Sequence, residues 1–281
     1  MLLLYLSQRS LFAFEIRDDQ GAVVIFTTPP QRIISLLPSL TETVCILGSC
    51  EKLVGVDRYS DWPTRVNKLP NLGGGLDPNI EAIVALKPDV VLTTRSARIS
   101  ERLKAVGIKV LVFNVDNYFG IEKTILQLAM LLGLKTAEGE LVWQNILKQI
   151  NLTANGLPVE TKGLRVYYEV SNSPYGAGQT SFIGETLSRL QVSNIIPGTL
   201  GSFPKLNPEF IVNANPQVIM LADSSSKDIE KRPGWHKINA VINRRICVFT
   251  PPENNILSRP GPRIPEAANI MANCLKKMYP Q

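Results

Sequence analysis

The 281-residue sequence has a single histidine, His236, and this limits the enzyme chemistry that it can carry out. A histidine-dependent triad would have to be built around His236, which lies in RPGWHKINAV, a stretch that we interpret as a surface turn and helix. The HExxH and GxSxG motifs are also missing. Asp57 and Asp61 form an acidic pair in a loop, but no partner for acid–base or metal chemistry accompanies them. The sequence therefore argues against an enzyme, and it predicts neither a cofactor nor a metal centre.

Long basic runs and long apolar runs are absent too. No run of Lys or Arg exceeds two residues and the net charge is only +6, so a nucleic-acid-binding surface is not indicated. The apolar stretch MLLLYLSQRSLFAF at the N-terminus is interrupted by SQRS and is too short for a membrane span. We interpret it as the end of a secretory signal peptide whose start is missing, with an ordinary amphipathic segment as the alternative.

The four cysteines, Cys45, Cys50, Cys247 and Cys274, do not have the CxxC or Cys/His spacing of a zinc site. Cys50 lies just beyond a helix that we expect to end at Gly48, so it could turn back towards Cys45. A bridge between Cys247, in a predicted strand, and Cys274, in the C-terminal helix, is the other possibility. The sequence leaves both pairings open.

One pattern occurs twice, about half a chain length apart: NIEAIVALKPDVVL begins at Asn79 and PEFIVNANPQVIML at Pro208. Each copy predicts a helix with apolar residues at helical spacing, a proline that ends the helix, and a short β-branched strand of the kind found in buried parallel sheets. The repeat therefore predicts two lobes with similar architecture.

Each copy also carries a glutamate, Glu81 or Glu209, in or near the first turn of its helix. Pro78 and Pro208 lie near the helix starts, where a proline loses no hydrogen bond. One glutamate at such a place is explained by the helix macrodipole. Two glutamates at matching places indicate a shared role, and both carboxylates should be exposed.

The order of the predicted elements gives an α/β fold of two lobes, joined by a long helix that falls at the midpoint of the chain. A helix capped by Ser39 or Thr41 should follow the first buried strand. The expected parts are an N-terminal segment with the possible signal remnant and a β-hairpin, a first lobe, a linker helix and a second lobe, at residues 1–30, 31–132, 133–157 and 158–281.

Two loops rich in glycine, proline and aromatic residues follow predicted parallel strands, where ligand sites usually lie. The first runs from Asp57 to Pro78, and NSPYGAGQTSFIG is its counterpart in the second lobe. The first loop contains Gly73, Gly74 and Gly75 without the pattern of a phosphate-binding loop. These glycines predict a tight turn or a close approach of the backbone to a ligand.

Several motifs together resemble the substrate-binding proteins of ABC importers for cobalamin, iron siderophores and haem, the helical-backbone metal receptors. They are PPQRIISLLPSLTETV, LVGVDRYSDWP, LGGGLDPNIEAIVALKPDVVL, RVYYEV, RPGW and RPGPRI, and they cover nearly the whole chain. The resemblance implies a fold of two Rossmann-like lobes joined by a single long α-helix, with a ligand in the cleft between the lobes. It also implies a periplasmic, monomeric protein that is not an enzyme. Within this family the sequence is most similar to the vitamin B12-binding proteins.

The resemblance also implies a set of ligand-contacting residues, and the sequence departs from the B12-binding proteins at some of them. Gly75 and Thr94 stand where those proteins have large aromatic residues, and Asn255 stands where they have an acid. Haem or a ferric siderophore therefore remains the alternative to a corrinoid, with Arg58, Arg95 and Arg259 as candidate basic groups. The full set of expected ligand contacts is Tyr59, Trp62, Gly75, Thr94, Tyr175, Phe203, Asn255 and Arg259.

In the resembling family, one glutamate on each lobe contacts arginines of the two subunits of an inner-membrane permease, and Glu81 and Glu209 stand at the matching positions. Two hypotheses follow from the sequence. The first is a binding protein that captures a corrinoid, such as cobalamin or cobinamide, and delivers it to a membrane permease. The second, more remote, is a Rossmann-like transferase that uses the same cleft. The paired glutamates favour the first, because catalysis in a cleft does not require them.

Overall fold

The computed structural model describes residues 13–75, 77–95, 99–171, 174–222 and 229–279. The chain forms two compact units. Unit 1 consists of the chain up to Asn114 together with Leu126–Gly139, and unit 2 consists of Val115–Ile125 and Glu140–Gln281. The prediction of an α/β protein with two lobes is confirmed.

Helices α4 (Tyr118–Leu131) and α5 (Thr136–Asn155) each contribute residues to both units. Helix α5 occupies most of the predicted linker at 133–157. Gly133, in the turn between the two helices, has a positive φ of 79°, which explains the break expected there. None of the helices in the described part of the chain is long and apolar enough to cross a membrane.

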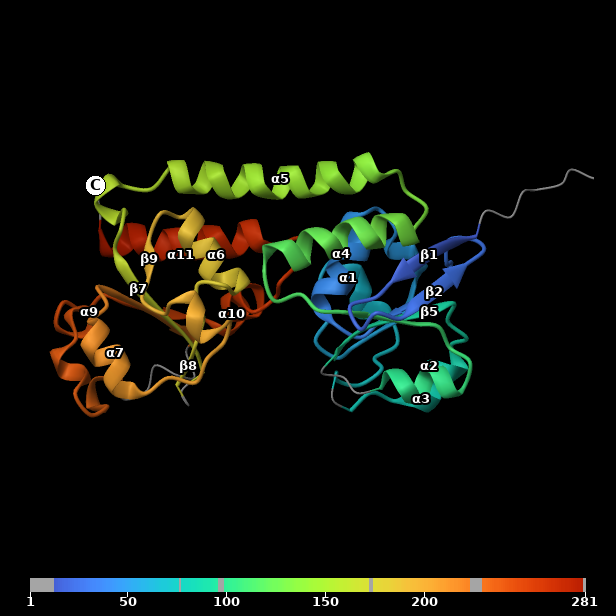
Figure 1. Cartoon of the computed structure of the whole chain (residues 1–281), viewed down its shortest axis with the longest axis horizontal. Helices are drawn as coiled ribbons and strands as arrows, with labels where there is room; N and C mark the ends of the chain where they lie inside the picture. The colour runs from blue at the N-terminus through green and yellow to red at the C-terminus, as the bar shows by residue number, and fades with distance from the viewer. Residues whose placement is uncertain (1–12, 76, 96–98, 172–173, 223–228, 280–281) are drawn as a thin grey trace, which may run out of the picture. The chain divides into compact units, whose positions relative to one another are not determined.

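Unit 1 is built on a four-stranded sheet in the order β4-β3-β5-β6, in which every neighbouring pair is parallel. Figure 1 shows the sheet between two layers of helices, with α2 and α3 on one face and α1 and α4 on the other. Because both faces are covered, the strands are almost continuously apolar. The strands and the remaining helices are β3 (Ile33–Ser35), β4 (Leu53–Val56), β5 (Val90–Thr94), β6 (Val110–Phe113), α1 (Pro38–Ile46), α2 (Ile80–Ala85) and α3 (Ser100–Ala105).

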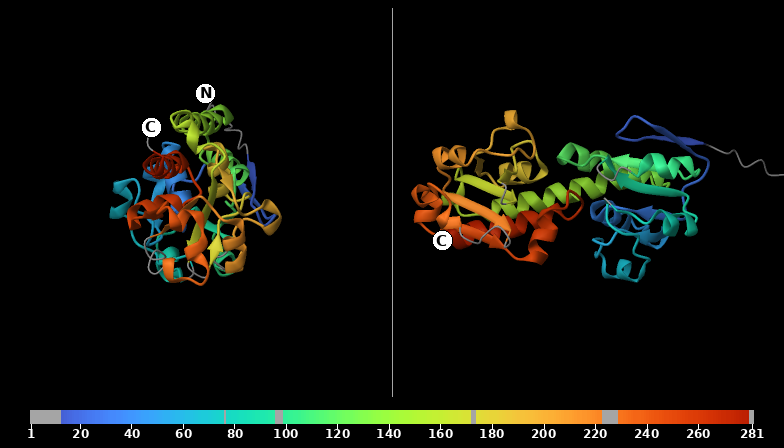
Figure 2. Two further views of the ribbon diagram at one scale, coloured as in Figure 1. Left: turned by 90° about the vertical axis from the view of Figure 1, so that its left-hand side faces the viewer. Right: turned by 90° about the horizontal axis from the view of Figure 1, so that it is seen from below.

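The predicted β-hairpin precedes this sheet as β1 (Phe14–Arg17) and β2 (Val23–Phe26), paired antiparallel. The right-hand view of Figure 2 shows it as a separate two-stranded ribbon, in blue. Asp18 holds the turn, because its Oδ1 accepts hydrogen bonds from the backbone of Gln20 at 2.9 Å and Ala22 at 2.8 Å. The first twelve residues of the expected signal-peptide remnant lie outside the described ranges.

Unit 2 repeats the arrangement of unit 1. Strands β9, β7, β10 and β11 are parallel neighbours in the same order as β4, β3, β5 and β6, and β8 is added antiparallel to β7. Figure 1 shows α6 and α11 on one face of this sheet and α7 and α9 on the other. The elements are β7 (Arg165–Ser171), β8 (Tyr175–Gly176), β9 (Ser193–Asn194), β10 (Val218–Ala222), β11 (Ile246–Phe249), α6 (Phe182–Arg189), α7 (Pro208–Ala214), α9 (Asn239–Ile242), α10 (Pro251–Leu257) and α11 (Ile264–Met278).

The two copies of the sequence repeat thus occupy equivalent places in the two units. The first copy forms helix α2 and strand β5, and the second copy forms helix α7 and strand β10. Ile83 in α2 and Ile211 in α7 are both fully buried in the core of their unit. Each helix is therefore fixed to its sheet by an equivalent apolar residue, and full burial of such a side chain contributes about 2 to 3 kcal/mol.

The expected cap of α1 is wrong. Leu37 is the N-cap, and its side chain caps nothing. Pro38 at the first helical position starts the helix instead, because its fixed φ suits that place. Ser39 and Thr41 lie inside the helix and are buried, and the hydroxyl of Thr41 bonds to Ser35 and Ser60 instead of capping the helix. Gly48, with a φ of 77°, follows the helix as expected.

Both cysteine pairs that the sequence left open are disulfides. Cys45, in α1, is bonded to Cys50 five residues later. Cys247, in β11, is bonded to Cys274 in α11 across a separation of 27 residues. The second bridge ties the edge strand of the unit 2 sheet to the C-terminal helix.

Replacing Cys247 and Cys274 together by serine should lower the free energy of unfolding by about 3 to 4 kcal/mol, because the bridge restricts a long loop of the unfolded chain. The matched variant without the Cys45–Cys50 bridge should lose only about 2 kcal/mol, since that loop is short. Urea unfolding followed by circular dichroism measures both. A larger loss for the short loop would contradict this ordering.

Candidate functional site

In unit 1 the candidate ligand residues gather where the parallel strands end. Tyr59 follows β4 directly, and Thr94 is the last residue of β5. Strands β4 and β5 flank β3, so both residues lie at the carboxyl edge of the same sheet, the usual place for a ligand in such folds. Tyr59 is 60% exposed, whereas Trp62, Gly75 and Thr94 are half-buried. The phenol ring of Tyr59 is therefore the one most open to a ligand.

A series of buried hydroxyl groups holds the start of the Tyr59 loop. The hydroxyl of Thr41 lies 2.9 Å from that of Ser35 and 2.8 Å from that of Ser60. Ser60 donates in turn to Oδ1 of Asp57 at 2.5 Å, while Oδ2 of Asp57 accepts from the backbone N–H of Tyr59 at 3.0 Å. The buried carboxylate thus connects the loop to α1 and β3, so that the backbone at Tyr59 is fixed while its side chain stays exposed.

The three glycines serve different purposes. Gly73 has a φ of 91°, and a Cβ there would lie 2.5 Å from the carbonyl oxygen of Asp77, so the predicted tight turn is confirmed. A Cβ on Gly74 would lie 2.7 Å from Oδ1 of Asp77 and 3.5 Å from the ring of Tyr59. At Gly75 a Cβ would meet only the carbonyl oxygen of Leu36, at 3.9 Å. Gly75 is therefore small for a reason other than local packing.

The two candidate basic groups of unit 1 follow strands of the same sheet, Arg58 after β4 and Arg95 after β5. Nη2 of Arg58 forms an ion pair with Oδ2 of Asp77 at 2.5 Å, and its guanidinium lies 5.9 Å from the centre of the Tyr59 ring. Arg95, which follows β5, is exposed and donates to the carbonyl oxygen of Asp19 at 3.3 Å. An ion pair or a hydrogen bond at such an exposed place is weak. Arg58 and Arg95 can therefore exchange partners readily.

Unit 2 has an apolar pocket of about 310 Å³ of its own. Phe203, one of the predicted ligand residues, lines it with 37% of its surface exposed, and its ring lies 6.1 Å from that of Phe182. Tyr175, also predicted, is 40% exposed in the short strand β8. The pocket, called here the Phe203 pocket, is lined by Val115, Asp116, Tyr168, Val170, Phe182, Ile183, Phe203, Ser258 and Pro260.

One wall of the Phe203 pocket is held by contacts between the segment at the start of α4 and helix α6. The backbone N–H of Phe182 donates to the carbonyl oxygen of Asp116 at 2.8 Å. The backbone N–H of Tyr118 donates to Oε2 of Glu185 at 2.5 Å, and the hydroxyl of Tyr118 lies 2.9 Å from that of Thr186. Burial raises the pKa of Tyr118 to about 12 and also raises the pKa of the Glu185 carboxyl. The phenol of Tyr118 is therefore neutral.

The sequence did not identify Tyr168 and Phe182 as pocket residues. Tyr167 and Tyr168 are neighbours in β7 and therefore point to opposite faces of the sheet. Tyr167 packs edge-on against Trp235, whereas Tyr168 stacks on Phe249 and lines the pocket. Burial raises the pKa of Tyr168, so its phenol stays neutral. The alternation was visible in RVYYEV, but only the neighbouring elements decide which tyrosine faces a pocket.

The last two predicted ligand residues belong to or follow helix α10. Asn255 is exposed on α10. Arg259, just after the helix, is only 8% exposed. Arg259 therefore differs from Arg58 and Arg95, which offer their side chains to solvent.

The two predicted docking glutamates occupy equivalent places at the starts of α2 and α7. The N-cap of α2 is Asn79, whose side chain accepts from the backbone N–H of Ala82 at 3.0 Å. The N-cap of α7 is Asn207, whose side chain accepts from the backbone N–H of Glu209 at 2.9 Å. Glu81 and Glu209 are each the second residue of their helix, and both are exposed as predicted. The paired asparagines were not predicted, although both stand two residues before their glutamate in the sequence.

The far ends of the two helices are also held in the same way. Lys87 and Asn215, which precede the prolines, both have a φ of 46°, in the left-handed region. The guanidinium of Arg32 donates to the carbonyl oxygen of Leu86 at 2.6 Å, and that of Arg165 donates to the carbonyl oxygen of Asn215 at 3.0 Å. These arginines satisfy carbonyl groups that the helix leaves without partners.

The arginine backbones are fixed by a further matching pair of side chains. Oδ2 of Asp89 accepts from the N–H of Arg32 at 2.8 Å, and Oε1 of Gln217 accepts from the N–H of Arg165 at 3.1 Å. Each helix is therefore held at both ends by groups in matching positions. Neither Glu81 nor Glu209 forms an ion pair with any residue that the structure describes. Their charges are thus available to a partner.

The sequence matches the family described as Periplasmic binding protein over residues 33–253. The chain belongs to this family. It is 31% identical over 281 residues to the uncharacterized ABC transporter substrate-binding lipoprotein YvrC of Bacillus subtilis (strain 168), an alignment that covers 96% of this chain and 87% of that protein.

Two further comparisons involve metal chelates or iron. The vitamin B12-binding protein of Pectobacterium carotovorum subsp. carotovorum (strain PC1) is 27% identical over 256 residues, covering 89% of this chain and 90% of that protein. The crystal structure of a possible iron-binding (periplasmic solute-binding) protein from Staphylococcus epidermidis ATCC 12228 superimposes with a TM-score of 0.77 at 29% identity, covering 88% of this chain and 99% of that one.

Proteins of this family bind a small molecule and work with the membrane permease of an ABC importer; they are not enzymes. The prediction that this chain is not an enzyme is therefore confirmed, and the transferase alternative is excluded. Within the described residues no group of three or more His, Cys, Asp or Glu side chains is placed to hold a metal ion.

The buried hydroxyl series yields a test of how the Tyr59 loop is held. Thr41→Val keeps the shape of the side chain but leaves buried hydroxyl partners unsatisfied, so it should cost about 1 to 3 kcal/mol of stability and speed hydrogen–deuterium exchange in residues 57–63. Thr43→Val is the matched control, because the hydroxyl of Thr43 bonds only to the carbonyl oxygen of Ser39 within α1. Equal exchange in the two variants would show that the series does not hold the loop.

Proposed function

We propose that this protein is the substrate-binding protein of an ABC importer and that it captures a corrinoid such as cobalamin or cobinamide for delivery to a membrane permease. The observation that carries the proposal is that each unit separately presents aromatic surface: unit 1 has an exposed tyrosine at a strand end, and unit 2 has an apolar pocket lined by aromatic rings. Flat, largely apolar macrocycles gain contact area from such rings at a small entropic cost. The vitamin B12-binding relative supports the corrinoid as the first choice.

A haem or a ferric siderophore is the second candidate, and particular residues favour it. Gly75 and Thr94 are small, and a Cβ on Gly75 would have room. Small residues at these two positions leave space for a ligand whose thickness differs from that of a corrinoid. Arg58 and Arg95 are exposed cations beside this surface and would suit the carboxylates or negative charge of such chelates. The resemblance to a possible iron-binding protein agrees with this alternative.

Tyr59→Ala should weaken ligand binding by about tenfold, because it removes the most exposed ring of the site. Tyr59→Phe keeps the ring and should stay within about threefold of the wild type. Isothermal titration calorimetry with cobalamin, cobinamide and haem in turn identifies the ligand and measures both variants.

Phe203→Ala provides the corresponding change in unit 2, and the exposed Leu141, on α5, provides a control position as Leu141→Ala. The proposal expects Phe203→Ala to weaken binding and Leu141→Ala to leave it unchanged. Failure of cobalamin, cobinamide and haem to bind the wild type in the micromolar range would overturn the ligand assignment.

We further propose that Glu81 and Glu209 dock the protein, as a monomer in the periplasm, on basic side chains of a dimeric permease. Support comes from the matching positions of the two carboxylates, from the equivalent hydrogen bonds that hold both helices, and from the absence of an ion pair to either carboxylate among the described residues. A protein with two equivalent helices suits a partner with two equivalent subunits.

The double variant Glu81→Arg with Glu209→Arg should bind its ligand normally and lose uptake in cells, because both carboxylates lie at helix starts and outside the Phe203 pocket. Each exposed ion pair contributes only about 0 to 1 kcal/mol, so the single variants should have smaller effects. Docking measured with purified permease should also weaken as the salt concentration rises.

Glu140→Arg, on the exposed surface of α5, is the control for the change in net charge. It should leave both ligand binding and uptake unchanged. Normal uptake by the Glu81→Arg, Glu209→Arg double variant, at wild-type protein level, would refute the docking role.

A further inference from the structure

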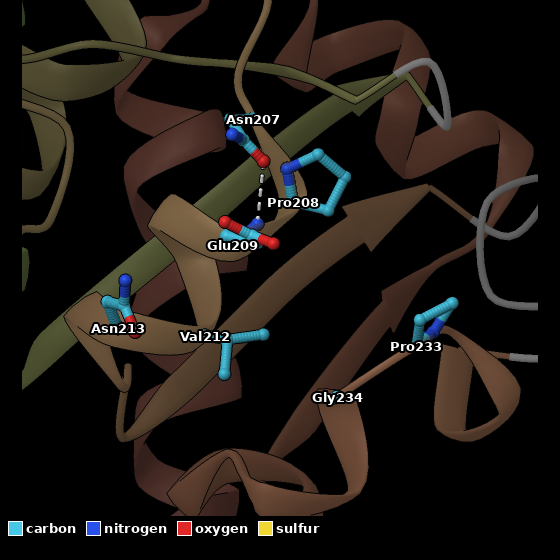
Figure 3. A pocket seen from close by; sticks show the side chains of 7 residues that line it. All are labelled: Asn207, Pro208, Glu209, Val212, Asn213, Pro233 and Gly234. Atoms are coloured by element: carbon cyan, nitrogen blue, oxygen red, sulfur yellow. Dashed lines mark hydrogen bonds between the residues drawn. The ribbon is translucent and has the colours of Figure 1, made fainter.

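Beside Glu209, unit 2 has a second pocket, which the ligand proposal does not use. Its volume is about 540 Å³, and it lies between helix α7 and the segment that contains Pro233 and Gly234. Figure 3 shows the side chain of Val212 directed from α7 towards this facing segment, with Glu209 above it on the same helix. This α7 pocket is lined by Asn207, Pro208, Glu209, Val212, Asn213, Pro233 and Gly234.

The segment that faces α7 is firmly held. Arg232 donates to both carboxylate oxygens of Glu169, at 2.6 and 2.9 Å, and the side chain of Glu169 is completely buried. The guanidinium of Arg232 also lies 4.5 Å from the ring centre of Trp235, which is buried in the core of unit 2. A two-pronged ion pair of this kind has a fixed geometry. The residues between Arg232 and Trp235 therefore form a defined wall.

The wall passes close to the helix at Gly234. Its φ is 81°, and a Cβ on Gly234 would lie 3.4 Å from Cγ2 of Val212. Glycine is thus the residue that gives this turn its conformation without strain. Because glycine has no side chain, the wall approaches Val212 at this point without covering it.

The chemistry of the lining indicates what the α7 pocket accepts. Among the described lining residues, Pro208, Val212 and Pro233 give it apolar sides, Asn207 and Asn213 add amide groups, and Glu209 carries the one charge. None of these described lining residues is cationic, and Glu209 forms no ion pair with any residue that the structure describes. A side chain with an apolar stem and a cationic head matches this lining, because its stem contacts the apolar sides while its head meets the carboxylate.

Unit 1 is built differently at the matching place. Val84 in α2 corresponds to Val212 in α7, but it is 42% exposed, whereas Val212 is half-buried. The difference arises after the repeated strand. Strand β5 leads to helix α3, whereas β10 is followed, among the described residues, by two short 3-10 helices at Ile229–Lys231 and Trp235–Lys237. The loop between these two short helices supplies the wall of the α7 pocket.

We propose that the α7 pocket receives a basic side chain, arginine or lysine, of the permease, so that unit 2 binds the permease by shape and charge and unit 1 chiefly by charge. This inference rests on the proposed docking role of Glu209 and adds a specific recognition site to it. The two docking helices then contribute unequally to the affinity, although their glutamates occupy equivalent positions.

The test fills the α7 pocket without touching Glu209. Val212→Phe places a ring in the pocket, and Asn213→Trp does so from an exposed position that is not part of the core. The matched controls are Val84→Phe and Ala85→Trp at the corresponding places of α2. Affinity is measured for the ABC permease of the same host, reconstituted in lipid nanodiscs, by biolayer interferometry. Both unit 2 variants should bind about tenfold more weakly, and both unit 1 controls should stay within about threefold of the wild type.

Thermal unfolding of each variant, recorded in parallel, shows whether the fold is kept, and Asn213→Trp preserves the test if Val212→Phe does not fold. Wild-type affinity of Asn213→Trp, together with weakened binding of Glu209→Arg, would overturn the pocket while leaving the docking role of Glu209 in place. Wild-type affinity of the double charge-reversal variant would overturn the docking role and the pocket together.

Discussion

The parallel pairing of β3 with β5 and of β7 with β10 is the constraint on which both candidate sites depend. A chain that links two parallel strands must cross the sheet, and it does so here through helices α2 and α7, which run back before the second strand of each pair. The helix starts and the strand ends therefore lie at the same edge of each sheet. In unit 1, this topology therefore determines where both the Tyr59 loop and the carboxylate of Glu81 lie. In unit 2, the same topology determines where Glu209 lies.

The two units keep this arrangement with partly different residues. Arg32 and Arg165 are the same residue type and bind the last carbonyls of their helices, but the side chain that fixes each arginine is Asp89 in unit 1 and Gln217 in unit 2. What matters physically is an oxygen that accepts the backbone N–H, and either side chain supplies it. The units differ in other features. Unit 1 holds its aromatic loop by buried hydroxyls, whereas unit 2 builds an apolar pocket and a rigid wall beside α7.

Local patterns in the sequence predicted most of the fold, because they depend on neighbouring residues. The hairpin at Asp18, the repeated helix and strand, and the turn at Gly73 are of this kind. The cap of α1 was wrong because Pro38 determines the helix start and the hydroxyl of Thr41 finds partners in β3 and in the Tyr59 loop. Tyr168 and Phe182 could not be identified as pocket residues from sequence alone. Each depends on which distant segment lies opposite, and that is decided by tertiary packing.

The central claim is that two equivalent helices present Glu81 and Glu209 to one membrane partner, and cross-linking in cells tests it most directly. A photoreactive amino acid is placed at position 81, at position 209 or, as a control, at position 140 on the exposed surface of α5. The account predicts that positions 81 and 209 both form covalent adducts with the same permease polypeptide and that position 140 forms none. Adducts from only one of the two positions, or from neither, would contradict it.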